Sequence, residues 1–433
     1  MYDVLVIGAG SAGYVAASVL ARQKLNVAVV EKGKFGGTCV NSGCVPSIFL
    51  FDSSFMLSRW QEIGDYKGLD VKVDFSNSTF SKRDDVVSYL SSAGRSLIEN
   101  AGGHVYKGSG RIIDKGVAET DEGEKICFKK LVVASGSVPK TPPGVMSEDE
   151  AVNLEYVPKD MIVVGGGYAG VEIAQIFSRL GSSVTLITRS RIMKGFSEKA
   201  REYLLQSLEF DGVQVKEFHE VKRMSEREVY TENGTFKGEV VVSATGRTPL
   251  IPEGLKSYSV NVKENGIIVR PTMMTDDPSV FAIGDVVDKP NKTAHSAMHE
   301  AIVASYNLIG KKLEVKYNCI PQVVYTDPQI GVVGSASRAV KFAEFPFNAV
   351  TRATIAGMRD GEVRIGFNEK GETVFGEVIG KNAEELINII TLAVRHRITA
   401  FELATTVFVH PSLSEGISNA AKTIFDLDID RFK

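Results

Sequence analysis

The chain has 433 residues, which at ~150 residues per domain predicts about three domains. Fifty basic and 53 acidic residues leave a formal net charge of -3, so no global field favours nucleic acid, and we expect none as a partner. No apolar run approaches the ~20 residues that cross a bilayer, so no membrane span is predicted. Four cysteines do not make a secreted disulfide framework, and a strand pattern from residue 2 leaves no room for a cleavable signal, which favours a cytoplasmic location.

The start of the chain has the order strand, glycine turn, helix, strand. The segments are residues 3–7, 8–13, 14–22 and 26–30. In dinucleotide-binding folds the first glycine lets the chain turn, the second lets the backbone approach the pyrophosphate, and the third lets helix and strand pack closely. Gly8, Gly10 and Gly13 stand at these positions, and Glu31 ends the second strand, where a carboxylate accepts hydrogen bonds from a ribose. We therefore predict a dinucleotide site here.

The same order of elements recurs in the middle of the chain. A strand at residues 161–164 precedes Gly165, Gly167 and Gly170, and a helix (171–180) and a strand (184–187) follow. Each unit is followed by a similar strand. The first runs over residues 131–136 and ends at Gly136, and the second runs over residues 240–247 and ends at Gly246 and Arg247. Two complete units predict two dinucleotide-binding domains.

From about residue 319 the pattern changes. Strand patterns cover residues 322–324, 331–333, 363–367 and 373–379, and helix patterns cover residues 383–394 and 400–403. This predicts an antiparallel sheet with helices and no nucleotide signature. The fold class is therefore α/β, with two Rossmann-like domains and a C-terminal α+β domain.

Two cysteines, Cys39 and Cys44, follow directly on the first unit. In an undistorted helix residues five apart have Cα atoms roughly 8.6 Å apart, beyond the ~7 Å limit for a disulfide. A bridge therefore needs a bent helix, which Gly43 and Pro46 permit. The alternative is two buried thiols that never bond, but the neighbouring glycines and cofactor fold favour a redox pair. No metal site is predicted, because the other two cysteines have no Cys or His within four residues.

These features resemble the flavin-dependent class I pyridine nucleotide-disulfide oxidoreductases, the family of dihydrolipoamide dehydrogenase, glutathione reductase and mercuric reductase. The resemblance rests on Gly-Gly-Thr-Cys-Val-Asn-Ser-Gly-Cys-Val-Pro-Ser at residues 36–47, on the two nucleotide units, and on residues 275–285, which end in Ala-Ile-Gly-Asp. It covers essentially the whole chain and is closest to dihydrolipoamide dehydrogenase. Mercuric reductase is disfavoured, because it needs a C-terminal thiol pair and no cysteine follows Cys319.

The resemblance implies an FAD-dependent NAD(P)H:disulfide oxidoreductase. FAD would bind residues 1–144 and 256–318, NAD(P)H would bind residues 145–255, and residues 319–433 would form the dimerisation domain of a homodimer. Cys44 would contact the flavin, Cys39 would exchange with a small-molecule or protein-bound disulfide or dithiol, and Asp285 would bind the ribityl chain. The implied cofactor-binding residues are Gly8, Gly10, Gly13, Glu31, Thr38, Gly136, Gly165, Gly167, Gly170, Glu172, Gly246, Arg247, Gly284, Asp285 and Arg189.

A C-terminal segment, Val409-His410-Pro411-Ser412-Leu413-Ser414-Glu415, supplies a candidate base. Disulfide exchange needs a group that makes a thiolate and returns the proton, and an imidazole held by a carboxylate suits that task. The segment differs from the family's His-Pro-Thr-Leu-Ser-Glu motif only at Ser412, so the resemblance assigns the base to His410 and its orientation to Glu415, acting on the partner subunit's cysteines. The alternative is a proline-flanked surface histidine. His295 and His299 have the spacing of a metal pair but resemble the family's helix beside the flavin, so we interpret them as structural.

Two positions depart from the family pattern. Ile48 stands where the family has a lysine beside the flavin, which leaves Glu172 without its partner. An NAD(P)H oxidase, or a reductase of quinones or other electron acceptors, with impaired disulfide turnover is therefore the alternative function. Thr188 stands where NAD-specific members have an acid, and Arg189 follows it, so NADP(H) is favoured over NAD(H). Against this, Gly170 is more typical of NAD sites. The alternative interpretation of the arginines in this loop is that they are surface residues that contact only solvent.

Overall fold

The computed structural model describes residues 1–63 and 78–428. Contacts divide the chain into two compact units. Unit 1 comprises residues 1–165, 180–182 and 221–315, and unit 2 comprises residues 166–179, 183–220 and 316–433. The division into three domains with the boundaries given above stays a prediction.

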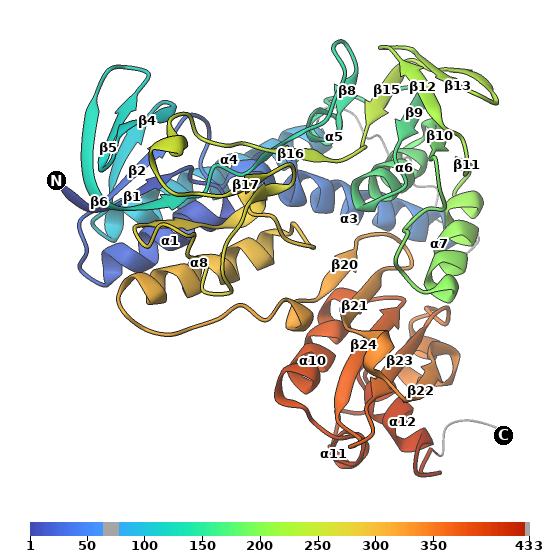
Figure 1. Ribbon diagram of the computed structural model, residues 1–433. Helices are drawn as coiled ribbons and strands as arrows, with labels where there is room; N and C mark the ends of the chain where they lie inside the picture. The colour runs from blue at the N-terminus through green and yellow to red at the C-terminus, as the bar shows by residue number, and fades with distance from the viewer. Residues whose placement is uncertain (64–77, 429–433) are drawn as a thin grey trace. The chain divides into compact units, whose positions relative to one another are not determined.

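Seven strands form the main sheet of unit 1: β1 (Tyr2–Ile7), β2 (Val27–Glu31), β3 (His104–Lys107), β4 (Gly110–Asp114), β5 (Val117–Thr120), β6 (Lys125–Val133) and β19 (Val280–Ala282). Their order is β3-β2-β1-β6-β5-β4, with β19 also on β6. Figure 1 labels β1, β2, β4, β5 and β6 of this sheet. The pairs β3-β2, β2-β1, β1-β6 and β6-β19 are parallel, so the turns that follow β1 and β19 lie at the same sheet edge. Ligands bind at that edge in open α/β sheets.

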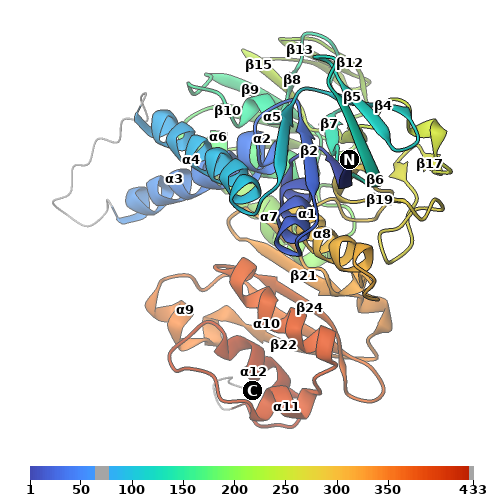
Figure 2. The ribbon, with the colours of Figure 1, turned by 90° about the vertical axis from the view of Figure 1, so that its left-hand side faces the viewer.

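The helices of unit 1 begin with α1 (Ser11–Arg22), which contacts both α4 (Ser78–Asn100) and α8 (Ala294–Leu308). Apart from Leu20, the buried face of α1 consists of small residues, including Ala12, Ala16 and Ala17, which allow this close packing. Two further helices, α2 (Gly37–Ser42) and α3 (Cys44–Ile63), carry the cysteine motif. α3 contacts α4, and this pair was not predicted from the sequence (Figure 2).

Unit 1 also holds the strand that precedes the second glycine turn, together with the strands that pair beside it. Three parallel strands, β8 (Met146–Ser147), β9 (Asp160–Val164) and β15 (Val240–Ser243), are joined in the order β9-β15-β8, and α5 (Glu148–Ala151) follows β8. Three strands, β12 (Val221–Met224), β13 (Glu228–Thr231) and β14 (Gly234–Lys237), form an antiparallel sheet. Two smaller antiparallel pairs join β7 (Ser137–Pro139) to β16 (Arg247–Pro249) and β17 (Val262–Lys263) to β18 (Gly266–Ile267).

Unit 2 contains α6 (Tyr168–Leu180) except for its last residue. β10 (Ser183–Ile187), α7 (Glu198–Phe210) and β11 (Gln214–Lys216) follow. β10 and β11 pair in parallel. α6 begins at Tyr168 and α1 at Ser11, so each helix starts three residues before its predicted start. Both therefore begin inside the glycine turn, where their first N–H groups are available to a phosphate.

The C-terminal part of unit 2 is an antiparallel sheet in the order β20-β21-β24-β23-β22. Its strands are β20 (Gln322–Val324), β21 (Ile330–Gly334), β22 (Lys341–Pro346), β23 (Glu362–Phe367) and β24 (Thr373–Ile379). α10 (Ala383–His396) packs on β21 and β24, and α12 (Glu415–Thr423) packs on β22, β23 and α11 (Ala400–Thr405) (Figure 2). α9 (Thr351–Ile355) is a short helix after β22. The predicted α/β fold with a C-terminal antiparallel sheet is confirmed.

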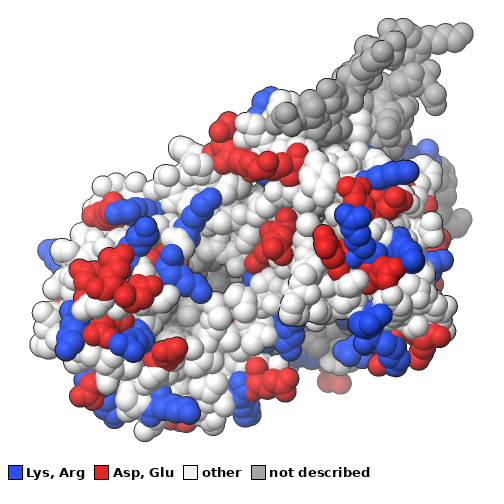
Figure 3. Space-filling view, turned by 90° about the horizontal axis from the view of Figure 1, so that it is seen from above, with Lys and Arg blue, Asp and Glu red and all other residues white. Residues whose placement is uncertain are grey.

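No helix among the residues described is long and apolar enough to span a membrane. On the face shown in Figure 3, basic and acidic side chains are interspersed, as the small net charge predicts.

Candidate active site

The first glycine turn, between β1 and α1, is fixed by close backbone contacts. Gly8 has a φ of +98°, and a Cβ on it would lie 2.4 Å from the carbonyl oxygen of Ala134. A Cβ on Gly13 would lie 1.8 Å from the carbonyl oxygen of Gly8, so both positions require glycine. Gly10 differs, since the nearest atom to its Cβ position is 3.7 Å away. A Cβ on Gly10 would only touch the Cα of Gly37 at van der Waals distance, so Gly10, beside the N-terminus of α1, is the least crowded of the three glycines, at the position where dinucleotide folds bind a pyrophosphate.

Glu31 is anchored to this turn. One of its carboxylate oxygens accepts the N–H of Ala9 at 2.5 Å, and the other accepts the N–H of Gly33 at 2.7 Å. The carboxylate therefore has a fixed position at the end of β2, where the sequence predicts a ribose contact.

The cysteine motif packs directly against the same turn. Gly36 forms a parallel bridge with Gly10, and its N–H donates to the carbonyl oxygen of Ala9 at 2.9 Å. Gly37 has a φ of +57°, and a Cβ on it would lie 2.7 Å from the Cα of Gly10. Any larger residue would separate the two segments, so these glycines hold the cysteines at the predicted nucleotide site.

The helix that carries the two cysteines is interrupted between them, as a redox pair requires. α2 ends at Ser42, α3 begins at Cys44, and Gly43 has non-helical dihedral angles of -139° and -115°. Both cysteines are thiols in this structure, so the disulfide stays a prediction. The Cys44 thiol and the Ser11 hydroxyl donate hydrogen bonds to Cys39, which lowers the pKa of Cys39 to about 7 although burial opposes the shift.

We expect alkylation of reduced Cys39 to follow a midpoint near pH 7, because the thiolate is the reactive form and Cys44 stabilises it. Iodoacetamide labelling across pH, read by peptide mass spectrometry, measures this midpoint. Replacing Cys44 with Ala should move the midpoint toward the ~8.5 of a free thiol. Cys127→Ser, a change on an exposed thiol of β6, should not move it. A midpoint for Cys39 that does not respond to the loss of Cys44 would contradict this account.

Asp285 is held in a polar network beside the same sheet edge. One Asp285 oxygen accepts the hydroxyl of Ser137 at 2.9 Å, and Ser137 in turn accepts Nε of Arg247 at 2.9 Å. Arg247 also reaches Thr38 at 3.3 Å and pairs with Asp149 at 2.7 Å. The predicted residues Thr38, Arg247 and Asp285 are therefore brought together by Ser137, which sequence reasoning missed.

The two strands that close the nucleotide units explain this convergence. The segments that follow Gly136 and Gly246 form the antiparallel pair β7 and β16, and the N–H of Leu250 donates to the carbonyl oxygen of Gly136 at 2.9 Å. Gly136 and Gly246 have φ values of +72° and +112°, so each position favours glycine. The sequence showed the similarity of these segments but carried no signal for their pairing. Together with the first glycine turn and Glu31, the polar groups of Thr38, Arg247 and Asp285 fit FAD.

The second glycine turn repeats the pattern of the first. Gly165 has a φ of +127°, and a Cβ on it would lie 2.1 Å from the carbonyl oxygen of Ala244. A Cβ on Gly167 would meet no described atom within 4 Å, and Gly170 is buried at the start of α6. Space for a phosphate is thus present at the middle glycine of this turn.

The loop after β10 contains one arginine that is free of ion pairs. Thr188 is buried against Gly166, whose Cβ would lie 2.9 Å from the Thr188 hydroxyl. Arg191 pairs with Glu198 at 2.8 Å. Arg189 is exposed and pairs with no carboxylate in the described part of the chain, so its guanidinium is available to a phosphate.

Glu172, on α6, is a partly buried carboxyl with a backbone hydrogen-bond partner. It accepts the N–H of Tyr325 at 2.9 Å, and no lysine or arginine pairs with it among the described residues. Burial raises the pKa of Glu172 to about 7, and the hydrogen bond from Tyr325 opposes the shift. Ile48 lies on α3 in unit 1 and is partly buried.

His410 and Glu415 form the predicted pair in unit 2. His410 Nδ1 lies 2.8 Å from one Glu415 oxygen, and the other oxygen accepts the N–H of Ser412 at 2.9 Å. The imidazole remains 65% exposed, so its Nε2 side is open to a reacting group. A cavity of about 420 Å³ lies beside this segment, and residues 411–414 line it together with residues of α9 and α10.

No cluster of metal-binding side chains occurs in residues 1–63 and 78–428. His295 hydrogen-bonds to Thr293 at 3.1 Å on the first turn of α8. Unit 1 therefore brings together the first glycine turn, Glu31, both cysteines, Thr38, Arg247 and Asp285, while Glu172, Arg189, His410 and Glu415 belong to unit 2.

Comparisons with known proteins agree with this arrangement. A family model described as pyridine nucleotide-disulphide oxidoreductase matches residues 2–301, and the model of that family's dimerisation domain matches residues 320–421. A dihydrolipoyl dehydrogenase from Geobacillus stearothermophilus is 32% identical over 450 residues, which cover 97% of this chain and 95% of the relative. Dihydrolipoyl dehydrogenase 3 from Haloarcula marismortui is 32% identical over 472 residues, which cover 99% and 98%.

Solved structures share the fold. LpdA from Mycobacterium tuberculosis superposes with a TM-score of 0.90 at 24% identity, covering 98% of this chain and 100% of the other. The HOCl-induced flavoprotein disulfide reductase RclA from Escherichia coli superposes with a TM-score of 0.86 at 22% identity, again covering 98% and 100%.

Proposed function

Because this chain belongs to the pyridine nucleotide-disulphide oxidoreductase family, we propose that it passes electrons from NADPH through FAD to Cys39 and Cys44, and from them to a disulfide substrate. FAD and a pyridine nucleotide are the cofactors typical of the family. One observation carries the proposal: the Gly10–Gly36 bridge holds two hydrogen-bonded thiols against the glycine turn that leads into the N-terminus of α1.

FAD supplies the hydride chemistry that amino acid side chains cannot perform. The chain would hold it through the first glycine turn, Glu31, Thr38 and Asp285. Arg247 is paired with Glu148 and Asp149, and it hydrogen-bonds to Thr38 directly and to Asp285 through Ser137, which holds these two side chains in place. Burial raises the pKa of Glu148, although Arg247 opposes the shift.

The protein's own groups then exchange thiol for disulfide. Cys39, with its pKa near 7, attacks one sulfur of the substrate, and a mixed disulfide forms while the other sulfur leaves as a thiolate. Cys44 displaces the second thiolate from Cys39, and the Cys39–Cys44 disulfide is restored. His410, held through Nδ1 by Glu415, takes the proton of each attacking thiol on Nε2 and returns it to the thiolate that leaves, so the two thiol protons end on the two product thiols. The match to the dimerisation domain indicates a homodimer, and we place His410 beside the partner subunit's cysteines.

The relatives named dihydrolipoyl dehydrogenase favour a lipoyl disulfide, either small or protein-bound, as the substrate. The test is to incubate the purified holoenzyme with NADPH and either lipoamide or glutathione disulfide, and to measure thiol release. Thiol release with neither disulfide, alongside rapid NADPH oxidation by a quinone or oxygen, would instead support the electron-acceptor reductase. That second candidate is favoured by Ile48 and by the absence of a cation partner for Glu172 among the described residues. We place the enzyme in the cytoplasm, acting without nucleic acid.

We expect NADPH to be preferred over NADH, because Arg189 is exposed and unpaired while Thr188 brings no negative charge to repel a 2′-phosphate. Arg189→Gln should lower kcat/KM for NADPH by roughly tenfold, about 1.4 kcal/mol, and leave NADH unchanged. Arg191→Gln is the matched control and should have a smaller effect, since Arg191 is already paired with Glu198. Steady-state kinetics with both nucleotides measure this. A tenfold preference for NADH would contradict the prediction from Thr188 and Arg189 and would support the NAD(H) site that Gly170 indicates.

A further inference from the structure

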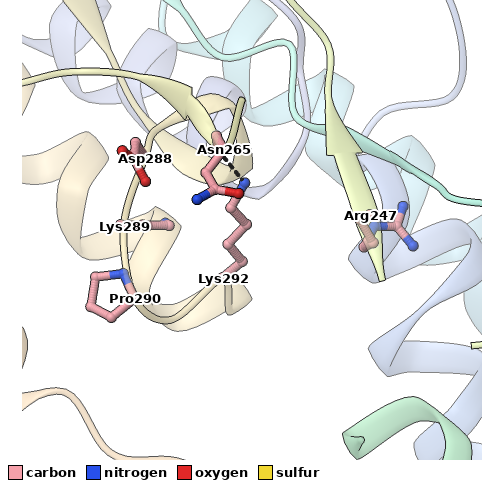
Figure 4. A pocket seen from close by; sticks show the side chains of 6 residues that line it. All are labelled: Arg247, Asn265, Asp288, Lys289, Pro290 and Lys292. Atoms are coloured by element: carbon pink, nitrogen blue, oxygen red, sulfur yellow. Dashed lines mark hydrogen bonds between the residues drawn. The ribbon is translucent and has the colours of Figure 1, made fainter. Parts of the chain in front are cut away.

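A cavity of about 580 Å³ opens in unit 1 beside the turn that carries Asp285 (Figure 4). Three cations line it, with one amide, one carboxylate and one proline: Arg247, Lys289, Lys292, Asn265, Asp288 and Pro290. The charge that this cavity offers to a ligand therefore depends on which of the three cations is already paired within the protein.

Two of the three cations are neutralised within the protein. Arg247 pairs with Glu148 at 3.0 Å and with Asp149 at 2.7 Å. Lys289 pairs with Glu300 at 2.7 Å, and both of these side chains are fully buried. Neither cation therefore has an uncompensated charge to offer to a ligand.

Lys292 is different. Its ammonium group donates to the backbone carbonyl oxygens of Asn265 at 2.9 Å, the bond drawn in Figure 4, and of Asp285 at 2.8 Å. No carboxylate among the described residues lies within ion-pair distance of it. Burial lowers the pKa of Lys292, and the charges of Asp285 and Asp288 oppose the shift. The group is thus a partly desolvated positive charge at the cavity wall that makes no direct ion pair with a described carboxylate.

The turn beneath Lys292 is rigid. Glu300 on α8 accepts the N–H of Gly284 at 2.8 Å and the hydroxyl of Ser296 at 2.9 Å, as well as the Lys289 ammonium. Lys292 stands two residues before the start of α8 and is bound to Asp285, the residue after Gly284. The ammonium group is therefore held in place by the same elements that position the predicted ribityl ligand.

Resting on the FAD site of the proposed function, we propose that Lys292 provides the positive charge that stabilises reduced FAD. Transfer of a hydride, which is one proton with two electrons, converts NADPH to NADP⁺ and leaves FAD with one additional negative charge. A preorganised cation lowers the free energy of that charged form and makes FAD easier to reduce. The cysteine motif itself offers no cation for this task, since Ile48 follows Ser47.

The test compares Lys292→Gln, which keeps a hydrogen-bond donor without charge, with Lys292→Arg, which keeps the charge. Lys263→Gln, on an exposed residue of β17, is the control. Each change is made in the full chain with Cys39 and Cys44 both replaced by Ser, so that FAD is the reducible group followed. FAD affinity is measured by fluorescence, and the reduction equilibrium is measured against a reference dye.

We expect Lys292→Gln to bind FAD but to shift the equilibrium about tenfold toward oxidised FAD, which is about 30 mV for a two-electron couple. Lys292→Arg and Lys263→Gln should stay within about threefold of the parent. An unchanged reduction equilibrium in Lys292→Gln, or equal shifts in the Gln and Arg variants, would overturn the inference. Lys292 would then only hold the loop through its hydrogen bonds to Asn265 and Asp285. A parent protein that takes up no FAD would overturn the proposed function, and this inference with it.

Discussion

Replacing His410 with Ala is expected to lower disulfide turnover by about 10²–10⁴-fold, the usual worth of a positioned general acid or base. FAD binding and reduction of the flavin by the nicotinamide should remain nearly intact, because the proposal gives His410, which Glu415 holds, a part only in thiol exchange. Stopped-flow reduction and steady-state turnover separate these two steps. Glu415→Gln, which keeps a hydrogen-bonding side chain, should cost less than His410→Ala.

Mixing variants tests whether the base acts across the dimer. Cys39→Ser and His410→Ala chains are each expected to be inactive alone, and exchange between them should restore activity in heterodimers. One of the two sites then contains both cysteines and an intact base. Failure of complementation, with subunit exchange shown by a tag, would place His410 beside its own chain's cysteines. Full activity of His410→Ala would show that His410 is a surface histidine and has no catalytic role.

Replacing Cys39 with Ser is expected to abolish disulfide turnover while NADPH still reduces the flavin. The serine hydroxyl is not deprotonated near neutral pH, so no nucleophile remains to attack the substrate. Cys44→Ser should also remove turnover, but through the loss of the thiol that would face the flavin. Cys127→Ser is the control and should be fully active, since Cys127 is exposed on β6. Thiol release from lipoamide measures all three variants, and turnover by Cys39→Ser above the level of the protein-free reaction would contradict the assignment.

The parts of the fold that were predicted correctly are those with a strong local pattern. The strands that flank the two glycine turns, and the helices that follow, have short apolar runs bounded by glycine. The predicted starts of α1 and α6 lie three residues later than the observed ones, because the last residues of each glycine turn already belong to the helix. They are helical because the dinucleotide turn ends inside the first helical turn.

What the sequence did not reveal depends on contacts between distant segments. β7 and β16 are three residues each, too short to carry a periodic signal, and their pairing brings Ser137 to Arg247. α3 and α4 form the other pair that sequence reasoning missed, although Gly102 and Gly103 mark the end of α4 just before β3. Lys292 stands in an unremarkable polar loop, and its role follows only from the carbonyl groups that it reaches.

The most direct test of the account is a stepwise anaerobic reduction of the FAD-loaded enzyme, with absorbance and thiol counting at each step. The account predicts that the first two electrons per chain reduce a Cys39–Cys44 disulfide, so that alkylation of both cysteines appears while the flavin stays oxidised and a long-wavelength thiolate-to-flavin band develops. Cys44→Ser should lack that band. Bleaching of the flavin by the first two electrons, with no new thiols at Cys39 and Cys44, would contradict the claim that these cysteines carry the electrons.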